Sequence, residues 1–272
     1  MVEVLELARL MLPPTVKQLD SWQREVLLSQ APENYINVHR QCGKTTIVGT
    51  RALSVAITED DSLILIFSAS YRQSQEMGRG VKLLLERYRD NLQRQYPDVH
   101  VDLGLLSDTK GSFELSNHSR IICLPPNPDT IRVYSSPRMI IFDEASRIPN
   151  ALYLAVRPMV FRTWTDPTVT PCQIFLLSTP FGQQGFFYEE SKRRAEEGRY
   201  HKWQHTIEDS IKGGRATRDF ANAEKRKGDD YYQQEWMCSF LGGLRTLFNQ
   251  TELDNALVDE APFNELYKLV AS

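Results

Sequence analysis

Short apolar runs alternate with amphipathic stretches along most of the chain. An apolar run bounded by polar or turn-forming residues is typical of a buried strand. The strands that this pattern predicts are Tyr35–Val38, Ser62–Ser68, Met139–Phe142 and Gln173–Leu177. Two alternating segments within Gly111–Leu124 flank Asn117 and His118, and they predict a hairpin.

Helical periodicity fills the intervals between the predicted strands. Apolar residues recur with this spacing from the second strand to about Arg94, and again over Ala151–Phe161, Phe186–Glu197 and Arg218–Phe240. Alternating strands and helices favour an α/β fold whose mostly parallel sheet carries helices on both faces. We expect one domain over residues 1–241. The apolar signal thins from Gly242, so residues 242–272 are expected to form a linker or a short helical appendage.

The segment after the first predicted strand contains most of a phosphate-binding loop. Gly43, Lys44 and Thr45 match the end of the G-x-x-x-x-G-K-[ST] pattern, but Val38 occupies the position of its first glycine. In such loops the lysine contacts the β- and γ-phosphates and the hydroxyl binds Mg²⁺. A helix N-terminus with nothing bound is the alternative. The residues expected to contact the nucleotide are Arg40, Gln41, Cys42, Gly43, Lys44, Thr45 and Thr46.

Two adjacent acids, Asp143 and Glu144, follow the predicted strand Met139–Phe142. Parallel strands place their carboxyl ends at the ligand crevice, so Asp143 is expected to share a Mg²⁺ ion with Thr45. Glu144 is expected to activate a water in line with the γ-phosphate as its general base. Capping of the following helix is the alternative for these acids.

Two further segments supply candidate contacts to the nucleotide. Ser178 and Thr179 end an apolar strand. One of them is expected to sense the γ-phosphate and relay hydrolysis to neighbouring segments. An ordinary strand-to-turn transition would give the same pattern. Gln23 lies in the N-terminal segment 1–34, which we expect on the adenine side, and its amide can donate to and accept from an adenine edge. The alternative is a solvated helix N-terminus.

Arginines are expected to complete the site, because guanidinium groups stabilise the charge of a phosphoryl transition state. The candidates are Arg40 in the loop, Arg132, and Arg138 and Arg147 beside the acids. The sequence leaves open which arginine acts in its own chain and which in a neighbouring one. A surface salt bridge is the more common role of a single arginine and is the alternative here, with Arg40 the exception.

Composition adds few constraints to this interpretation. Hydrophobic residues make up 41% of the chain and charged residues 25%, as in ordinary globular proteins. No apolar run is long enough to span a membrane, and the four scattered cysteines lack zinc-site spacing, which favours reduced thiols. The net charge of −3 gives no overall attraction to nucleic acid. Basic residues that could contact DNA, or simply form a solvated face, are Lys110, Arg120, Lys192, Arg193 and Arg194.

The order of these motifs resembles the ATPase domain of the large terminase subunit of tailed bacteriophages. That family often has a phosphate loop without its first glycine but with an arginine, as in Arg40–Thr45. Its Ser-Thr-Pro coupling segment is similar to Ser178–Pro180. The other similar segments, within a resemblance that runs from Leu19 to Phe240, are Arg132–Ser135, Asp143–Ala145, Gly185–Tyr188, Tyr232–Trp236 and Phe240.

The resemblance implies a P-loop sheet of the additional-strand, catalytic-glutamate type that hydrolyses ATP with Mg²⁺. Lys44, Thr45, Asp143 and Glu144 would take the roles given above. The motor would translocate double-stranded DNA into a preformed capsid in the cytoplasm of an infected host cell. It would form a homo-oligomeric ring on the portal protein, work with the small terminase subunit, and receive an arginine from a neighbouring subunit. Arg138 is the preferred arginine for that role, and Arg132 is next.

Full-length terminases also carry a nuclease domain, and we find no sequence pattern for one here. Only 32 residues follow Phe240, so DNA cleavage is not expected of this chain. One explanation is a fragment, in which residues 242–272 would be the linker or the start of a missing nuclease domain. The other is a natural ATPase-only protein. Two other functions stay open: a helicase-like nucleic-acid translocase, and a nucleotide-gated assembly protein with little turnover.

Overall fold

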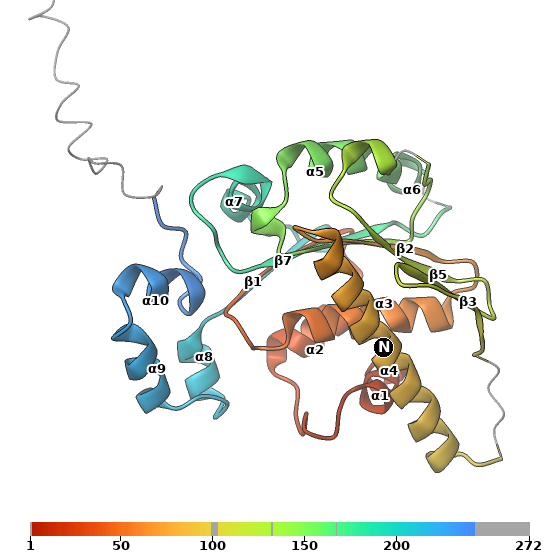
Figure 1. Ribbon diagram of the computed structural model, residues 1–272, viewed down its shortest axis with the longest axis horizontal. Helices are drawn as coiled ribbons and strands as arrows, with labels where there is room; N and C mark the ends of the chain where they lie inside the picture. The colour runs from red at the N-terminus through yellow and green to blue at the C-terminus, as the bar shows by residue number, and fades with distance from the viewer. Residues whose placement is uncertain (1, 99–102, 132, 167, 243–272) are drawn as a thin grey trace, which may run out of the picture. The chain divides into compact units, whose positions relative to one another are not determined.

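The computed structural model describes residues 2–98, 103–131, 133–166 and 168–242. Within these residues the chain forms an eight-stranded sheet in the order β3-β4-β5-β2-β6-β7-β1-β8 (Figure 1). The strands are β1 (Glu33–Val38), β2 (Leu63–Phe67), β3 (Leu105–Asp108), β4 (Ser112–Leu115), β5 (Arg120–Leu124), β6 (Met139–Asp143), β7 (Gln173–Ser178) and β8 (Tyr200–His205). All pairings from β5 to β8 in this order are parallel, whereas β3 and β4 pair antiparallel.

Strand β7 lies between β1, which leads into the phosphate loop, and β6, which ends in the acidic pair. Asn37 of β1 is in register with Ser178 of β7, and Leu177 of β7 is in register with Asp143 of β6. These three strands therefore end at the same level. The inserted strand is the additional-strand arrangement, so the predicted fold class is confirmed.

Helices cover both faces of this sheet (Figure 1). One face packs against α1 (Val2–Met11), α2 (Ser21–Leu28), α3 (Lys44–Thr58) and α4 (Tyr71–Gln95). The other face packs against α5 (Asn150–Val156), α6 (Phe161–Thr165) and α7 (Gly185–Lys192). The strands supply both cores by alternation: Ile64 and Ile66 face the first set, and Leu65 and Phe67 face the second.

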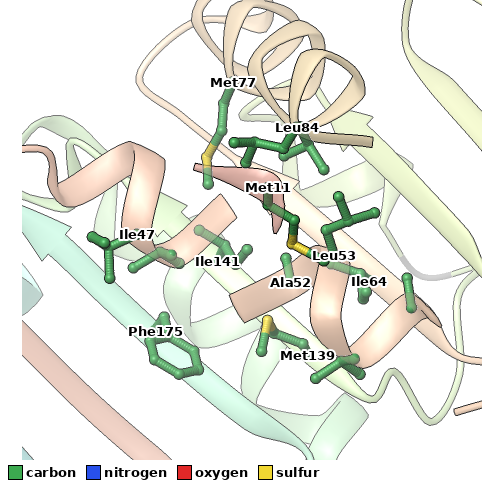
Figure 2. Packing of buried hydrophobic residues seen from close by; sticks show 14 of the residues in the cluster. Met11, Ile47, Ala52, Leu53, Ile64, Met77, Leu84, Met139, Ile141 and Phe175 are labelled. Atoms are coloured by element: carbon green, nitrogen blue, oxygen red, sulfur yellow. The ribbon is translucent and has the colours of Figure 1, made fainter. Parts of the chain in front are cut away.

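Helix α3 is fixed by the first of these cores. Figure 2 shows Ile47 and Leu53 of α3 among side chains of the sheet, such as Ile141, and of α4, such as Leu84. Leu53 is fully buried, and burying a side chain of this size contributes about 1.5–3 kcal/mol. Because α3 starts at Lys44, this packing holds the end of the phosphate loop in place.

Between β8 and residue 242 the structure describes three helices: α8 (Ile207–Lys212), α9 (Arg218–Lys225) and α10 (Asp229–Glu235). They share a small core made of Ile207, Ala221, Tyr232 and Trp236. This group of helices, here called the C-terminal helices, lies beside β1 and its loop, because the Arg40 N–H donates to the Glu235 carbonyl at 3.3 Å.

The structure divides two of the predicted helices. Within Ala151–Phe161, Pro158 interrupts the α-helix, and a 3₁₀ turn (Arg157–Val160) separates α5 from α6. Within Arg218–Phe240, Gly228 adopts a φ of 146° between α9 and α10, a conformation that side chains rarely allow. The helical pattern had continued across both breaks because the flanking residues keep apolar positions on one side.

Several elements were absent from the sequence prediction. The predicted helix Phe186–Glu197 ends at Lys192, and β8 follows as an edge strand whose polar residues hide its strand character. The exposed strand β3 and the helices α1 and α8 were also not predicted. The chain divides into residues 1–241 and 242–272, and the expected linker or nuclease start lies outside the described residues.

Candidate nucleotide site

The phosphate loop has the backbone shape that anion binding requires. Gln41 and Gly43 both lie in the left-handed region, with φ of 63° and 87°. Alternating right- and left-handed residues turn successive N–H groups toward one concave side, and α3 adds the positive end of its dipole from Lys44 onward. The loop therefore forms an anion-binding cradle even though Val38 replaces the first glycine.

Lys44 lies at the centre of the site. Its side chain is only 9% exposed, and its Nζ lies 3.2 Å from Oε1 of Glu144. A buried ammonium group needs an anionic partner, and here the carboxylate predicted to be the general base provides it. A γ-phosphate placed between the two residues would take over the contact with Lys44 and leave the Glu144 carboxylate for a water molecule.

Thr45 and Asp143, the neighbours of Lys44 and Glu144 in sequence, are also in contact. The Thr45 hydroxyl donates to Asp143 Oδ1 at 3.3 Å. Burial, and then the neighbouring Glu144 charge, raise the pKa of Asp143 to about 6. A hydroxyl and a buried carboxylate are hard oxygen ligands, and Mg²⁺ usually takes one or two such groups together with phosphates and waters. The donor set therefore fits Mg²⁺.

Glu144 is held by a second strand end. Ser178 donates from its hydroxyl to Glu144 Oε2 at 3.3 Å, and the Ser178 and Ser146 hydroxyl oxygens lie 2.8 Å apart. Since Ser178 has one hydroxyl proton, Ser146 is the donor in the second bond. Glu144 itself adopts a φ of 54°, in the left-handed region that residues other than glycine rarely occupy. Thr179, the other predicted coupling residue, is buried directly after Ser178.

Gln23, the residue expected to contact adenine, is bound within its own chain. Its side chain is only 3% exposed, and the amide Nε2 donates to the carbonyl of Cys42 at 2.9 Å. The amide oxygen accepts from the Asp20 N–H and from Arg215 Nη2. An amide engaged in this way supports the loop, and contact with an adenine edge would require it to give up one of these bonds.

The arginines proposed for the site differ in their surroundings. Arg40 is 57% exposed and its Nε lies 3.0 Å from Glu235 Oε2, so contact with a phosphate requires it to leave this carboxylate. Arg147 stacks on Phe181, with 4.0 Å between its Cζ and the ring centroid. Arg132 lies outside the described residues.

Arg138, the preferred candidate for a trans-acting arginine, is bound within its own chain, so contact with a neighbouring subunit would require it to leave these partners. It precedes β6, so it lies at the amino edge of the sheet, opposite the acids. Its guanidinium donates to both carboxylate oxygens of Glu59, at 2.6 and 2.9 Å, and to the Pro171 carbonyl at 3.0 Å. With 11% of its side chain exposed, Arg138 instead joins α3 to the start of β7.

Two of the basic residues considered for DNA binding are also engaged elsewhere. Arg193 lies 2.8 Å from Glu33 and stacks on Tyr200, and Lys192 pairs with Glu189. The remaining candidates, Lys110, Arg120 and Arg194, are exposed.

A cleft that the sequence had not revealed adjoins the loop. It measures about 640 Å³ and is bounded by residues 39–42 on one side. The C-terminal helices and the segment between them line the other side with Arg215, Phe220, Tyr231 and Trp236. Phe220 packs edge-on against Trp236 and is 43% exposed. The only sequence signal for this cleft was the aromatic segment Tyr232–Trp236 noted in the resemblance.

The described residues contain no helix long and apolar enough to cross a membrane. The fold is similar to that of several solved structures. One is the ATPase domain of the Thermus phage P74-26 large terminase, at 18% sequence identity and a TM-score of 0.60, covering 82% of this chain and 94% of that one.

Two larger structures show the same fold. The large terminase of the thermophilic bacteriophage D6E in complex with ADP matches at 12% identity and a TM-score of 0.59, covering 86% of this chain. The HK97 bacteriophage large terminase matches at 12% identity and a TM-score of 0.60, covering 88%. This chain spans 57% and 55% of those two proteins. Residues 36–255 match the family described as terminase large subunit, T4likevirus-type, N-terminal, and the chain belongs to that family.

Proposed function

We propose that this chain hydrolyses ATP to ADP and phosphate, and that as part of a large terminase it drives double-stranded viral DNA into a procapsid. The observation that carries the proposal is the meeting of three strand ends: Lys44 with Glu144 at 3.2 Å, Thr45 with Asp143 at 3.3 Å, and Ser178 with Glu144 at 3.3 Å. Family membership and the shared fold support it.

Each of these residues has a distinct part in the proposed reaction. Lys44 binds the β- and γ-phosphates in place of its present partner Glu144 and offsets the charge that develops on them. Glu144, released from Lys44, accepts a proton from the attacking water. Ser178 keeps the second oxygen of Glu144 in place during this exchange. Because Ser178 ends the inserted strand, loss of the γ-phosphate would change the position of Thr179 and of the segment that follows it.

Thr45 and Asp143 would hold Mg²⁺ in this scheme. When bound, the ion supplies positive charge to the β- and γ-phosphate oxygens. The cleft beside the loop would hold the nucleotide base, because its size and its mixture of aromatic walls with two guanidinium groups suit a purine. Phe220 and Tyr231 offer ring surface for stacking, and Arg215 lies next to them.

The partners belong to the same proposal. A ring of copies on the portal protein, with the small terminase subunit, would receive an arginine from the neighbouring subunit. Arg138 and Arg132 are the candidates for that role. DNA would be held through its phosphates. Affinity for duplex DNA should then fall steeply as salt rises, and a flat salt response would show that this domain alone does not grip DNA.

Steady-state phosphate release tests the enzymatic core. Wild type with ATP and Mg²⁺ should release phosphate, and the Glu144→Gln variant should do so about 10²–10⁴ times more slowly while still binding ADP. The matched control is Glu86→Gln, which removes an exposed carboxylate from α4. Absence of release by wild type, even with portal protein and DNA present, would favour a nucleotide-gated assembly protein. Unwinding of duplex DNA would favour a helicase-like translocase.

A further inference from the structure

His39, the residue that joins β1 to the phosphate loop, is enclosed between the loop and the C-terminal helices. Its side chain is buried, with 5% of the residue exposed. Its Nδ1 lies 2.6 Å from the carbonyl oxygen of Arg40, and its Nε2 lies 2.7 Å from the hydroxyl of Ser210 on α8. The same hydroxyl lies 3.0 Å from Nε2 of His205, the last residue of β8.

The hydrogen positions in this cluster follow from the acceptors. A carbonyl oxygen only accepts, so Nδ1 of His39 carries a proton. Burial is the largest effect that lowers the pKa of His39, to about 4, so the ring is neutral and its Nε2 is an acceptor. Ser210 must therefore donate to His39. With its one proton used, the Ser210 oxygen accepts from His205 Nε2–H. The bonds run in one direction, from His205 through Ser210 and His39 to the Arg40 carbonyl.

This chain of bonds fixes the peptide unit between Arg40 and Gln41. A trans peptide places its C=O and its N–H on opposite sides, so holding the Arg40 carbonyl against the His39 ring turns the Gln41 N–H the other way. Gln23 has the same effect on the peptide unit between Cys42 and Gly43. It donates to the Cys42 carbonyl, so the Gly43 N–H points the opposite way. Among the described residues, neither of these two N–H groups donates to a protein acceptor.

We propose that Ser210 and His39 are positioning residues for the phosphate cradle: they lock the Arg40 carbonyl outward and so aim the Gln41 N–H at the β-phosphate. The proposal rests on the nucleotide-binding role given above and adds to it the means by which the loop keeps its shape without the first glycine. It also makes the C-terminal helices part of the phosphate site, since Ser210 belongs to α8.

The test compares the affinities of ADP and AMP, because only ADP has the β-phosphate. His39→Gln keeps a polar atom near Ser210 but loses the donor to the Arg40 carbonyl, whereas His39→Asn keeps a donor at the Nδ1 position. We expect ADP to bind His39→Gln and Ser210→Ala about tenfold more weakly than wild type, the effect of one hydrogen bond to a charged group. AMP should bind with less than about a twofold change.

His39→Asn and Ser210→Thr should retain most of the ADP affinity. The first keeps a donor to the Arg40 carbonyl, and the second keeps the hydroxyl that donates to His39. The control is Ser62→Ala, which removes a buried hydroxyl at the opposite edge of the sheet. General damage to the fold would weaken ADP and AMP equally and would overturn the proposal, as would unchanged ADP binding in His39→Gln and Ser210→Ala. If wild type binds neither nucleotide, the proposed function fails as well.

A second measurement needs no variant. The ¹⁵N spectrum of the imidazoles in wild type distinguishes protonated from unprotonated ring nitrogens. We expect His39 to be protonated at Nδ1 and His205 at Nε2. The reverse tautomer at His39 would contradict the direction of the bonds and with it the positioning role.

Discussion

Replacing Arg138 with alanine tests whether this arginine serves the fold or the chemistry. The substitution removes two hydrogen bonds to Glu59 and one to the Pro171 carbonyl. It also leaves the Glu59 carboxylate, which is 37% exposed, without its cation. The damage lies at the amino edge of the sheet, so we expect lower stability and an unchanged rate of ATP hydrolysis per folded molecule.

The size of the effect follows from the partial burial of the pair. Exposed ion pairs contribute about 0.2–1 kcal/mol, whereas removing one partner of a buried pair costs about 3–5 kcal/mol. With side-chain exposures of 11% and 37%, the Arg138–Glu59 pair lies between these limits, and we expect a loss of about 2 kcal/mol. For a domain of this size that loss lowers Tm by about 4–8 °C.

Urea unfolding and phosphate release at a temperature well below Tm separate the two roles. Arg138→Lys is the matched variant, since it keeps the charge but loses the two-pronged contact, and it should lie between wild type and Arg138→Ala. A double variant with Glu59→Ala should lose less than the two single effects added together. If Arg138→Ala leaves the urea midpoint unchanged but lowers ATP hydrolysis by the assembled ring more than about tenfold, the reasoning is refuted and Arg138 acts on the nucleotide.

Three further predictions concern the loop and the carboxylates. Ser178→Ala removes the bond to Glu144, so kcat should fall about tenfold with little change in KM, and an unchanged kcat would exclude this supporting role. Gln23→Leu leaves the Cys42 carbonyl without its donor; ADP should bind about tenfold more weakly, and unimpaired binding would indicate that the loop holds its shape without Gln23. Because the pKa of His39 is lowered to about 4, the unfolded chain binds more protons below about pH 6.5, so the free energy of unfolding should fall with acidification. Between pH 7 and 5 the free energy of unfolding should fall by about 1–2 kcal/mol less in His39→Asn than in wild type. Identical pH profiles for the two proteins would contradict a buried neutral His39.

The catalytic edge could be predicted from the sequence because short-range signals carry it. Lys44 and Thr45 follow a strand and open a helix, and Asp143 and Glu144 end another strand. Once the sheet is parallel, strand ends of this kind come together at one edge. The contacts of Thr45 with Asp143 and of Lys44 with Glu144 follow from that rule.

The direction of individual side chains was beyond the reach of such signals. Arg138 directly precedes the acidic strand, but the strand separates it from the acids by its full length, and Glu59 comes from the end of a helix far away in sequence. Gln23 donates to the loop while Arg215 engages its amide oxygen, a contact between residues 192 positions apart. Long-range partners of this kind decide the role of a polar residue, and one sequence does not reveal them.

The cleft beside the loop escaped prediction for a related reason. Its walls come from the loop and from helices that follow the edge strand β8, which itself reads as polar. Without β8, nothing in the pattern places the C-terminal helices beside the loop.

A structure of this chain with Mg²⁺ and a non-hydrolysable ATP analogue tests the central claim most directly. We predict the γ-phosphate between Lys44 and Glu144, the ion on Thr45 and Asp143, and the base in the cleft beside Phe220. A nucleotide bound elsewhere, with Lys44 still paired to Glu144, would contradict the account.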